Sequence, residues 1–370
     1  MEKQLDNLTY YATGVTIALI GILGAFGNIM VQLAFIIDKK IRTPTNIFIL
    51  SISLSDLAIS VFGNPISASA SLSRRWLFGE AGCKWYGFAN TFFGLVSINT
   101  HALIAIDRYL IIVKPHIGCY ITKKRAVMMS TVAWFLALLW SVFPLIGWSE
   151  YTFEGAGMMC SVLWQSDETD DVLYVVSLFL SSFVLPITIM IFCYVGVFRT
   201  LRSAASIQAA WNPESAEKNL KVQKSFFKMV FIIAMAYLIS WTPYSVVALM
   251  STFGDPKYIS ATSATIPAIL AKTSIIYNPI IYVVMNRNFR RAFLKMMTCC
   301  FHGNVDKMKH PVQEDNQMKD KKLTTEIPLT TYPLGTTRLD SNVRECGCPP
   351  VEVLSIPGQI VSSFIEKSAV

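Results

Sequence analysis

The stretch Tyr258–Asn286, YISATSATIPAILAKTSIIYNPIIYVVMN, decides the fold of this chain, and Lys272 is its only charged residue. Fourteen residues of the stretch precede Lys272 and fourteen follow it. In a membrane helix rising about 1.5 Å per residue, the lysine would lie roughly 20 Å from either end. Its side chain could not reach the lipid headgroups, and burying its charge costs at least about 3 kcal/mol. The amine therefore needs a buried anion, a water-filled cavity or a covalent modification.

The composition of the whole chain is that of a membrane protein, because 53% of its 370 residues are hydrophobic and 15% are charged. Seven apolar stretches are each long enough to cross a hydrocarbon layer of about 30 Å as a helix. They are Ala12–Ile37, Thr45–Ser71, Trp85–Ile106, Ala126–Trp148, Val172–Phe198, Met229–Phe253 and Tyr258–Asn286. We predict an all-α membrane protein, a seven-transmembrane helix bundle with a short amphipathic eighth helix, over residues 12–300.

Basic residues predict the orientation of the bundle. Most Lys and Arg residues outside the seven stretches flank the side that carries the C-terminus, and this bias marks the cytosolic side. We therefore expect residues 1–11 to form an extracellular tail and residues 301–370 a disordered cytosolic tail. The net charge of +8 follows from this bias and requires no nucleic-acid partner. A basic inner face instead suits anionic membrane lipid and an acidic partner surface.

Three segments outside the spans carry further predictions. Asn7 begins an Asn-Leu-Thr glycosylation acceptor on the outer side. A polar loop is expected at about Arg199–Lys228, and an amphipathic helix lying on the membrane at Asn286–Met297. Cys299 and Cys300 follow that helix and are either palmitoylated or free thiols.

The tail after residue 301 loses all apolar periodicity and contains repeated threonine pairs. One interpretation is disorder with no specific role. The other is a phosphorylatable segment that recruits desensitising partners, a receptor kinase and arrestin.

Two cysteines, Cys83 and Cys160, lie on the predicted outer side, where disulfides persist. A bridge between them would hold the loop between spans four and five over the mouth of the bundle. Two unpaired thiols are the alternative. The four histidines show no metal-ligand spacing, so we predict no metal site.

Polar motifs close two of the spans on the cytosolic side. Asp107-Arg108-Tyr109 ends the third span, and Arg108 can pair with Asp107 at rest. In the seventh span, Pro279 removes a backbone donor and kinks the helix, and Asn278 can satisfy the freed groups.

Each of the seven spans contains one short signature, and together these signatures resemble those of the rhodopsin-like G-protein-coupled receptor family. The resemblance covers about residues 10–300. The matching residues are Asn28, Asp56, Asp107-Arg108-Tyr109, Trp134, Pro186, Trp241-x-Pro243 and Asn278-Pro279-x-x-Tyr282. The resemblance implies a heterotrimeric G protein as partner. It also implies that G-protein activation involves Asp107, Arg108, Tyr109, Asn278, Pro279 and Tyr282.

Lys272 lies seven residues before Pro279, the proline of the seventh span. Within that family, a lysine at this spacing resembles the characteristic lysine of the opsins. In opsins this amine forms a Schiff base with retinal, in the 11-cis or all-trans form. The resemblance implies a retinal pocket lined by Trp241, Tyr244, Gly94, Tyr86, Asn90, Trp164, Phe183 and Ala268. Ordinary core packing is the alternative for these residues.

A protonated Schiff base needs a buried anion. Vertebrate visual opsins place a glutamate three residues after the first bridging cysteine, and here that position is Tyr86, which is not an anion near pH 7. A second candidate, Glu154, stands six residues before Cys160. We expect Glu154 to be the counterion, directly or through water. An exposed loop glutamate is the alternative, and Glu150 and Asp167 are weaker rivals.

Several segments look most like the peropsin branch of the opsins. They are Gly82-Cys83-Lys84-Trp85-Tyr86, Phe253-Gly254-Asp255-Pro256-Lys257, Ala271-Lys272-Thr273-Ser274 and Tyr282–Ala292. This branch implies a light-driven retinal isomerase with little signalling, as an alternative to a signalling photoreceptor. Gln223 replaces an acidic residue that faces the third-span arginine in many receptors, which leaves the G protein open.

Two further functions compete with these predictions. A receptor for a diffusible ligand could use Lys272 to pair an acidic ligand group. A microbial-type proton pump also uses a seventh-span lysine, but the motifs of spans three and seven argue against it. Soluble enzymes are excluded by the seven spans.

Overall fold

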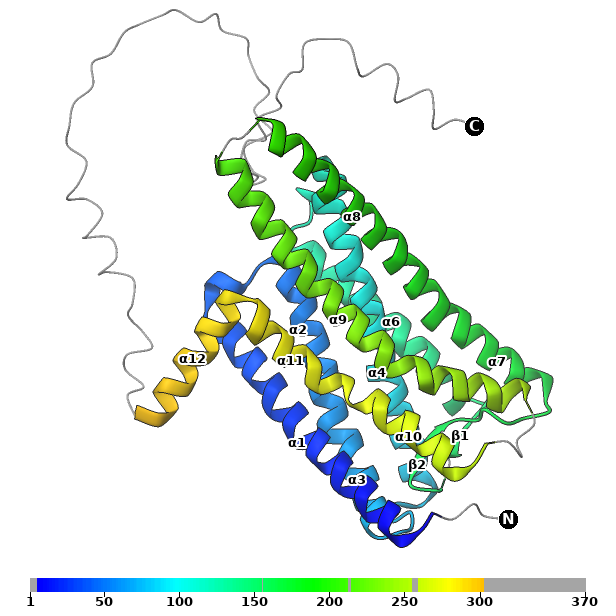
Figure 1. Ribbon diagram of the computed structural model, residues 1–370. Coiled ribbons are helices and arrows are strands. Elements are labelled where there is room, and N and C mark those ends of the chain that lie inside the picture. The colour runs from blue at the N-terminus through cyan, green and yellow to red at the C-terminus, as the bar shows by residue number, and fades with distance from the viewer. Residues whose placement is uncertain (1–4, 155, 212–213, 255–258, 303–370) are drawn as a thin grey trace, which may run out of the picture. The chain divides into compact units, whose positions relative to one another are not determined.

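The computed structural model describes residues 5–154, 156–211, 214–254 and 259–302, and the side chains of 205–219 and 297–302 are outside this description. Seven helices of the described chain are long and apolar enough to cross a membrane (Figure 1). They run over Asn7–Ile37, Pro44–Leu72, Gly79–Ile112, Lys123–Leu145, Thr169–Ala204, Leu220–Phe253 and Ala261–Met285. Each contains most of one predicted span, so the predicted seven-helix architecture is confirmed.

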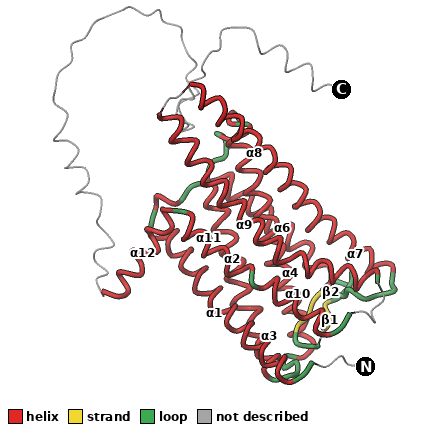
Figure 2. The backbone as a smooth tube through the Cα atoms, in the orientation of Figure 1, coloured by secondary structure: helices red, strands yellow, loops and turns green. Residues whose placement is uncertain are grey.

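The individual elements follow one another along the chain as helices with a single hairpin between them (Figure 2). The first half consists of α1 (Asn7–Ile37), η1 (Lys39–Ile41), α2 (Pro44–Ala58), η2 (Ile59–Gly63), α3 (Asn64–Leu72), α4 (Gly79–Val113), α5 (Pro115–Gly118), α6 (Lys123–Val142) and η3 (Phe143–Leu145). The second half consists of β1 (Tyr151–Glu154), β2 (Met159–Val162), α7 (Thr169–Phe179), η4 (Leu180–Val184), α8 (Leu185–Trp211), α9 (Glu214–Phe253), α10 (Ala261–Lys272), α11 (Ser274–Met285) and α12 (Arg287–His302).

Polar caps set where several helices begin. The side chain of Asp6 accepts a hydrogen bond from the Thr9 backbone, so α1 starts at Asn7 rather than near the predicted Ala12. Thr43 caps α2 in the same way, and Pro44 occupies the first turn, where its missing N–H costs nothing. Helix starts thus follow the capping residues rather than the edges of the apolar stretches.

The predicted polar loop at 199–228 is largely helical. Helix α8 continues to Trp211, and α9 begins at Glu214. The extension is rich in Ala, Gln, Glu, Lys and Leu, which favour helix in the absence of an apolar face. The loop prediction is therefore wrong for most of this segment, and its ends remain in the core, where Leu201 is buried and Phe226 and Phe227 pack against the core.

Two wide π turns interrupt the second and fifth spans. Each ends two residues before a proline: η2 ends before Pro65, and η4 ends before Pro186. Proline lacks an N–H and clashes with the preceding turn, so the helix rearranges locally. The two turns place Ile59 and Phe183 in the wall of an internal cavity described below.

The proline of the seventh span is compensated by a different residue from the one predicted. Pro279 cannot donate to the carbonyl of Ile275, and the side-chain amide of Asn28 donates to that carbonyl at 3.0 Å. Asn278 instead donates to Asp56 Oδ2 at 2.8 Å. Both residues are buried. The kink is therefore satisfied from α1, and Asn278 ties α11 to α2.

The short helix after the seventh span is α12, as predicted. Phe289, Ala292 and Met296 are buried, whereas Arg290 and Arg291 are exposed. The Phe289 ring stacks on Tyr282, with ring centroids 5.7 Å apart. An amphipathic helix is therefore anchored directly to the end of the seventh span.

Replacing Asn28 tests the compensation of the proline kink. Asn28→Ala leaves the Ile275 carbonyl buried and unpaired, which costs about 1–3 kcal/mol. We expect a clearly lower thermal unfolding midpoint of the purified protein. In a Pro279→Ala background, the new backbone N–H at position 279 can satisfy the carbonyl, so the same change should cost less.

Asn99→Ala is the matched control, because the amide of Asn99 makes only a 3.5 Å contact to the Ala133 carbonyl in a partly buried position. An equal loss from Asn28→Ala with and without Pro279 would contradict the account.

Candidate functional site

An internal cavity lies between the helices, beneath the β1–β2 hairpin. Its walls come from α4, η4, α9 and α10 and from the hairpin itself, and they are mainly apolar and aromatic. Every residue predicted for the pocket lines this cavity. These residues are Lys272, Glu154, Trp241, Tyr244, Gly94, Tyr86, Asn90, Trp164, Phe183 and Ala268. The fold thus brings together residues that are far apart in sequence, from Tyr86 on α4 to Lys272 on α10.

Lys272 enters the cavity at a break in the seventh span. It is the last residue of α10, and α11 begins at Ser274 after a tightened turn at Thr273. The Lys272 Nζ donates to Asn90 Oδ1 at 3.1 Å and lies 5.2 Å from the centroid of the Tyr86 ring. An amide oxygen and an aromatic face both stabilise a cation without carrying a full charge.

Glu154 ends strand β1, and its side chain points into the same cavity. The Tyr244 hydroxyl donates to Glu154 Oε2 at 3.3 Å. Burial raises the pKa of Glu154 to about 7, against opposing effects of Tyr244, Ser161 and the Lys272 charge. Among the described residues no ion pair joins Glu154 to Lys272, so their interaction is longer than a direct contact.

The rival carboxylates lie elsewhere. Glu150 and Asp167 are exposed, and neither lines the cavity, whereas Glu154 is half-buried. The alternative that Glu154 is an exposed loop glutamate is therefore wrong.

Trp241 forms the floor of the cavity on α9. Its Nε1 donates to Ser274 Oγ at 3.2 Å, and its ring stacks on Tyr237 with centroids 5.6 Å apart. Gly94 on α4 faces this indole: a Cβ at that position would lie 3.1 Å from Trp241 Cη2. The small residue predicted beside the pocket is thus what allows the tryptophan to reach α4.

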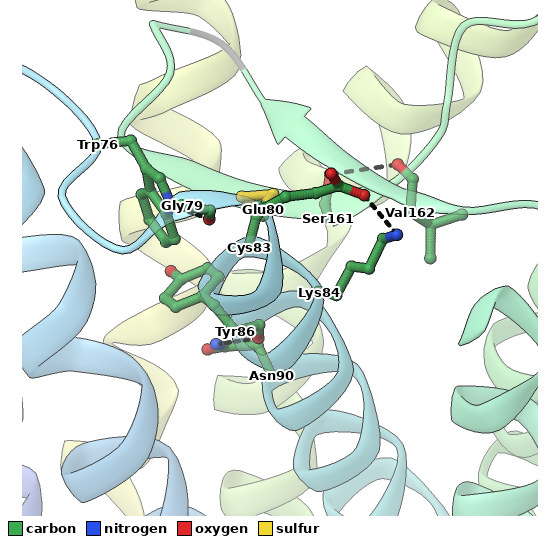
Figure 3. Close-up of a disulfide and its surroundings, with 10 residues drawn as sticks. Trp76, Gly79, Glu80, Cys83, Lys84, Tyr86, Asn90, Ser161 and Val162 are labelled. Atoms are coloured by element: carbon green, nitrogen blue, oxygen red, sulfur yellow. Dashed lines mark hydrogen bonds and ion pairs between the residues drawn. A yellow bond between two sulfur atoms is a disulfide. The ribbon is translucent and has the colours of Figure 1, made fainter.

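The hairpin is fixed over the cavity. The predicted disulfide between Cys83 and Cys160 joins α4 to β2, and Tyr86 and Asn90 follow it along α4 (Figure 3). At the other strand, the Tyr151 hydroxyl donates to the Ser141 carbonyl at 2.8 Å. Both strands are therefore tied to the bundle, and Glu154 is held in place.

Two buried residues were missed: Tyr237, which lines the cavity, and His101, which packs against Tyr237. The Tyr237 hydroxyl donates to the Gly94 carbonyl at 3.2 Å, and its ring lies 4.7 Å from that of His101. His101 is 1% exposed, and its Nδ1 lies 2.7 Å from the Ser97 carbonyl. A lone histidine within an apolar span was the available signal for His101. Tyr237 carried none, because an aromatic residue in an apolar helix is ordinary.

The Asp107-Arg108-Tyr109 motif forms a compact polar cluster at the end of α4 away from the hairpin. Arg108 Nε donates to Asp107 Oδ2 at 3.0 Å, as predicted for a resting pair. Thr45 on α2 donates to the same oxygen at 2.6 Å and also accepts from Arg108. The Arg108 guanidinium lies 4.6 Å from the Phe226 ring on α9. The arginine thus links three spans.

Tyr109 does not join this polar cluster. Its ring packs against Phe192 on α8, with centroids 5.4 Å apart, and a Cβ at Gly196 would lie 2.6 Å from it. Tyr282 is fully buried at the base of α11.

The predicted modification sites fall at the edges of the described chain. Asn7 is exposed at the start of α1, where its side-chain oxygen accepts from Arg74 at 2.8 Å. Cys299 and Cys300 belong to the end of α12, and their side chains lie outside the described residues. The threonine pairs of the tail also lie outside them.

Comparison with known proteins places this architecture in a family. Residues 27–282 match the family described as "7 transmembrane receptor (rhodopsin family)". Human "Visual pigment-like receptor peropsin" is 36% identical over 285 residues, covering 77% of this chain and 84% of the relative. The rhodopsin of Sepia officinalis is 33% identical over 341 residues, covering 89% of this chain and 71% of the relative.

A solved structure agrees with these relatives. The crystal structure of squid rhodopsin superposes with a TM-score of 0.75 at 31% identity, covering 88% of this chain and 94% of that chain. The seven spans and the family match define a multi-pass membrane receptor. The chain belongs to the rhodopsin family of seven-transmembrane receptors, whose members couple to G proteins. The predicted family and the likeness to peropsin are confirmed.

The titration of Glu154 can be predicted from its burial. Because the pKa is raised from 4.5 to about 7, the carboxyl group should be neutral at pH 5.5 and ionise as the pH rises through about 7. Difference infrared spectroscopy of the retinal-free protein should show a carboxylic-acid band that disappears over this range. The band should be missing in Glu154→Gln. A Glu154 carboxyl already ionised at pH 5.5 would contradict the prediction.

Proposed function

We propose that this receptor is a retinal-binding photoreceptor that uses Lys272 as the attachment point. The observation that carries the proposal is one lysine amine, the only one among the described residues that line a mainly apolar and aromatic cavity. Such a cavity fits a long apolar polyene with one reactive end. When bound, retinal supplies an aldehyde that links to the amine as a Schiff base and a polyene whose shape changes with light.

Lys272 is well placed for this role by the local structure. The break at Thr273 ends α10 directly after the lysine, so its side chain emerges where the helix is not continuous. Ala268 and Ala271 line the same cavity beside it. Apolar neighbours lower the local dielectric constant and so strengthen electrostatic interactions around the nitrogen.

Glu154 is the residue we assign as counterion. Its carboxylate, held by Tyr244 and by the tethered hairpin, faces the cavity that contains Lys272. Near pH 7 the group sits close to its midpoint in the retinal-free protein, where the Lys272 charge already favours its ionised form, and a protonated Schiff base would keep a positive charge at the same position. Glu154 thus compensates a charge that would otherwise be costly to bury.

We assign transmission to α9. A chromophore that changes shape against Trp241 would displace the indole from Ser274, and Pro243, inside α9, would act as the pivot. The opposite end of α9 carries Phe226 against Arg108. Outward movement of that end would release Arg108 from Asp107 and open a groove for a heterotrimeric G protein. Arrestin and a receptor kinase would act at the tail.

The orientation required by this scheme is an extracellular N-terminus and a cytosolic C-terminus. The charge bias of the connecting segments supports it. So does the disulfide, since Cys83 and Cys160 would then lie on the oxidising side.

A second candidate is a light-driven retinal isomerase, the activity that the resemblance to the peropsin branch implies, and the similarity to human and mouse peropsin supports it. Both functions use the same cavity and differ in the starting isomer and output. Chromophore extraction before and after illumination, run beside a nucleotide-exchange assay, separates them. Conversion from 11-cis to all-trans with exchange supports the receptor; the reverse conversion without exchange supports the isomerase.

A receptor for a diffusible acidic ligand, paired with Lys272, is a third possibility. Failure of the purified protein to form a pigment with any retinal isomer would favour it.

The attachment point is tested by reconstitution with 11-cis and all-trans retinal. The unsubstituted protein should develop a visible absorbance band with at least one isomer, and Lys272→Ala should develop none, because no other amine lines the cavity within the described residues. Glu154→Gln should keep the pigment but move its absorbance to the ultraviolet near neutral pH. A visible band that survives Glu154→Gln unchanged would remove Glu154 as counterion.

A further inference from the structure

The nearest polar partner of Lys272 is an amide rather than a carboxylate. Nζ lies 3.1 Å from Asn90 Oδ1, whereas no ion pair within 4.0 Å joins it to Glu154 among the described residues. The hydrogen bond and the compensating charge therefore come from two different residues on two different elements, α4 and β1.

The amide of Asn90 has a fixed direction. Its Nδ2 donates to the Tyr86 carbonyl at 2.8 Å, one turn earlier on α4 (Figure 3). The reversed amide would set an NH₂ group against the ammonium and an oxygen against the carbonyl, and both contacts would be repulsive. The backbone of α4 thus leaves the oxygen facing Lys272.

A glycine on the neighbouring span makes room for this arrangement. A Cβ at Gly63 would lie 2.7 Å from Asn90 Oδ1 and 2.9 Å from its Nδ2. Gly63 ends the π turn η2, so the turn and the missing side chain together create the space that the amide fills. Three spans therefore converge to present one acceptor to one amine.

We propose that Asn90 is a positioning residue whose Oδ1 accepts a hydrogen bond from the Nζ–H of Lys272 once the amine carries retinal, while Glu154 supplies the compensating charge from farther away. This inference rests on the proposed function. It adds that two roles belong to different residues: Asn90 helps to keep the proton on Nζ, and Glu154 compensates the positive charge. A neutral amide stabilises the buried N–H by a hydrogen bond but cannot neutralise it.

Four variants separate the two roles. They are Asn90→Leu, Asn90→Asp, Glu154→Gln and the double variant Asn90→Asp with Glu154→Gln. The other titratable groups lining the cavity are Tyr86 on α4, Glu154 on β1, and Tyr237 and Tyr244 on α9. None of the tyrosines is changed, so their contribution is constant across the set.

The measurement is the pH at which the absorbance of the reconstituted pigment moves from the visible to the ultraviolet. Asn90→Leu should lower this pH by about one unit, the effect of losing one hydrogen bond to a charged group. Asn90→Asp should raise it by about one to three units, because a carboxylate then contacts Nζ. The double variant should recover the visible absorbance that Glu154→Gln loses.

Asn99→Leu is the matched control, since Asn99 lies on the same helix and contacts Ala133 on α6 instead of the cavity. It should titrate like the unsubstituted pigment. If Asn90→Leu does not fold, the near-isosteric Asn90→Asp variants decide the question.

The two hypotheses fail in different ways. A normal pigment with unchanged titration in Asn90→Asp and no recovery in the double variant overturns the role of Asn90 and leaves the photoreceptor intact. No pigment in the unsubstituted protein overturns the photoreceptor. In that case reductive methylation of Lys272 by formaldehyde with cyanoborohydride as the hydride donor, followed by mass spectrometry against pH, still tests the contact: Asn90→Asp should shift the reaction to higher pH, and an unshifted profile rejects it.

Discussion

The placement of one amine inside a helix bundle, in the wall of a mainly apolar cavity, is the constraint on which this structure depends. An uncompensated ammonium group in such a place would be expelled or neutralised. The chain surrounds Lys272 with an amide oxygen from α4, the face of Tyr86 and, at longer range, Glu154. The disulfide and the hairpin hold Glu154 over the cavity, and the π turn at Gly63 makes room for Asn90. Elements that are distant from Lys272 in sequence thus position the groups that stabilise its charge.

The seven spans could be predicted from the sequence because they rest on strong, local signals, whereas the residues of the cavity could be predicted only from the resemblance to the opsins. Long apolar stretches identify membrane helices almost by length alone. A charged residue inside such a stretch must have a polar environment, so Lys272 indicated the position of the site. Glu154 was predicted from the resemblance to the opsins, which gives a candidate counterion position six residues before Cys160, and the disulfide holds this part of the loop at the bundle. The Arg108–Asp107 pair followed from adjacency.

Contacts between spans could not be predicted in the same way. Asn28 and Asn278 are both buried amides, and sequence alone could not say which one satisfies the Ile275 carbonyl. That choice depends on how α1 and α2 pack against α11. The role of Thr45 beside Arg108, the stack of Tyr237 on Trp241 and the space at Gly63 have the same origin. The helical conformation of 199–228 was missed because polarity was taken to indicate a loop.

Covalent capture tests the central claim most directly. The receptor reconstituted with retinal is reduced with borohydride, digested and analysed by mass spectrometry. The account predicts one retinyl adduct, on the peptide that contains Lys272, and none when the aldehyde is left out. A visible pigment whose adduct maps to another lysine, or reduction that yields no adduct at all, would contradict it.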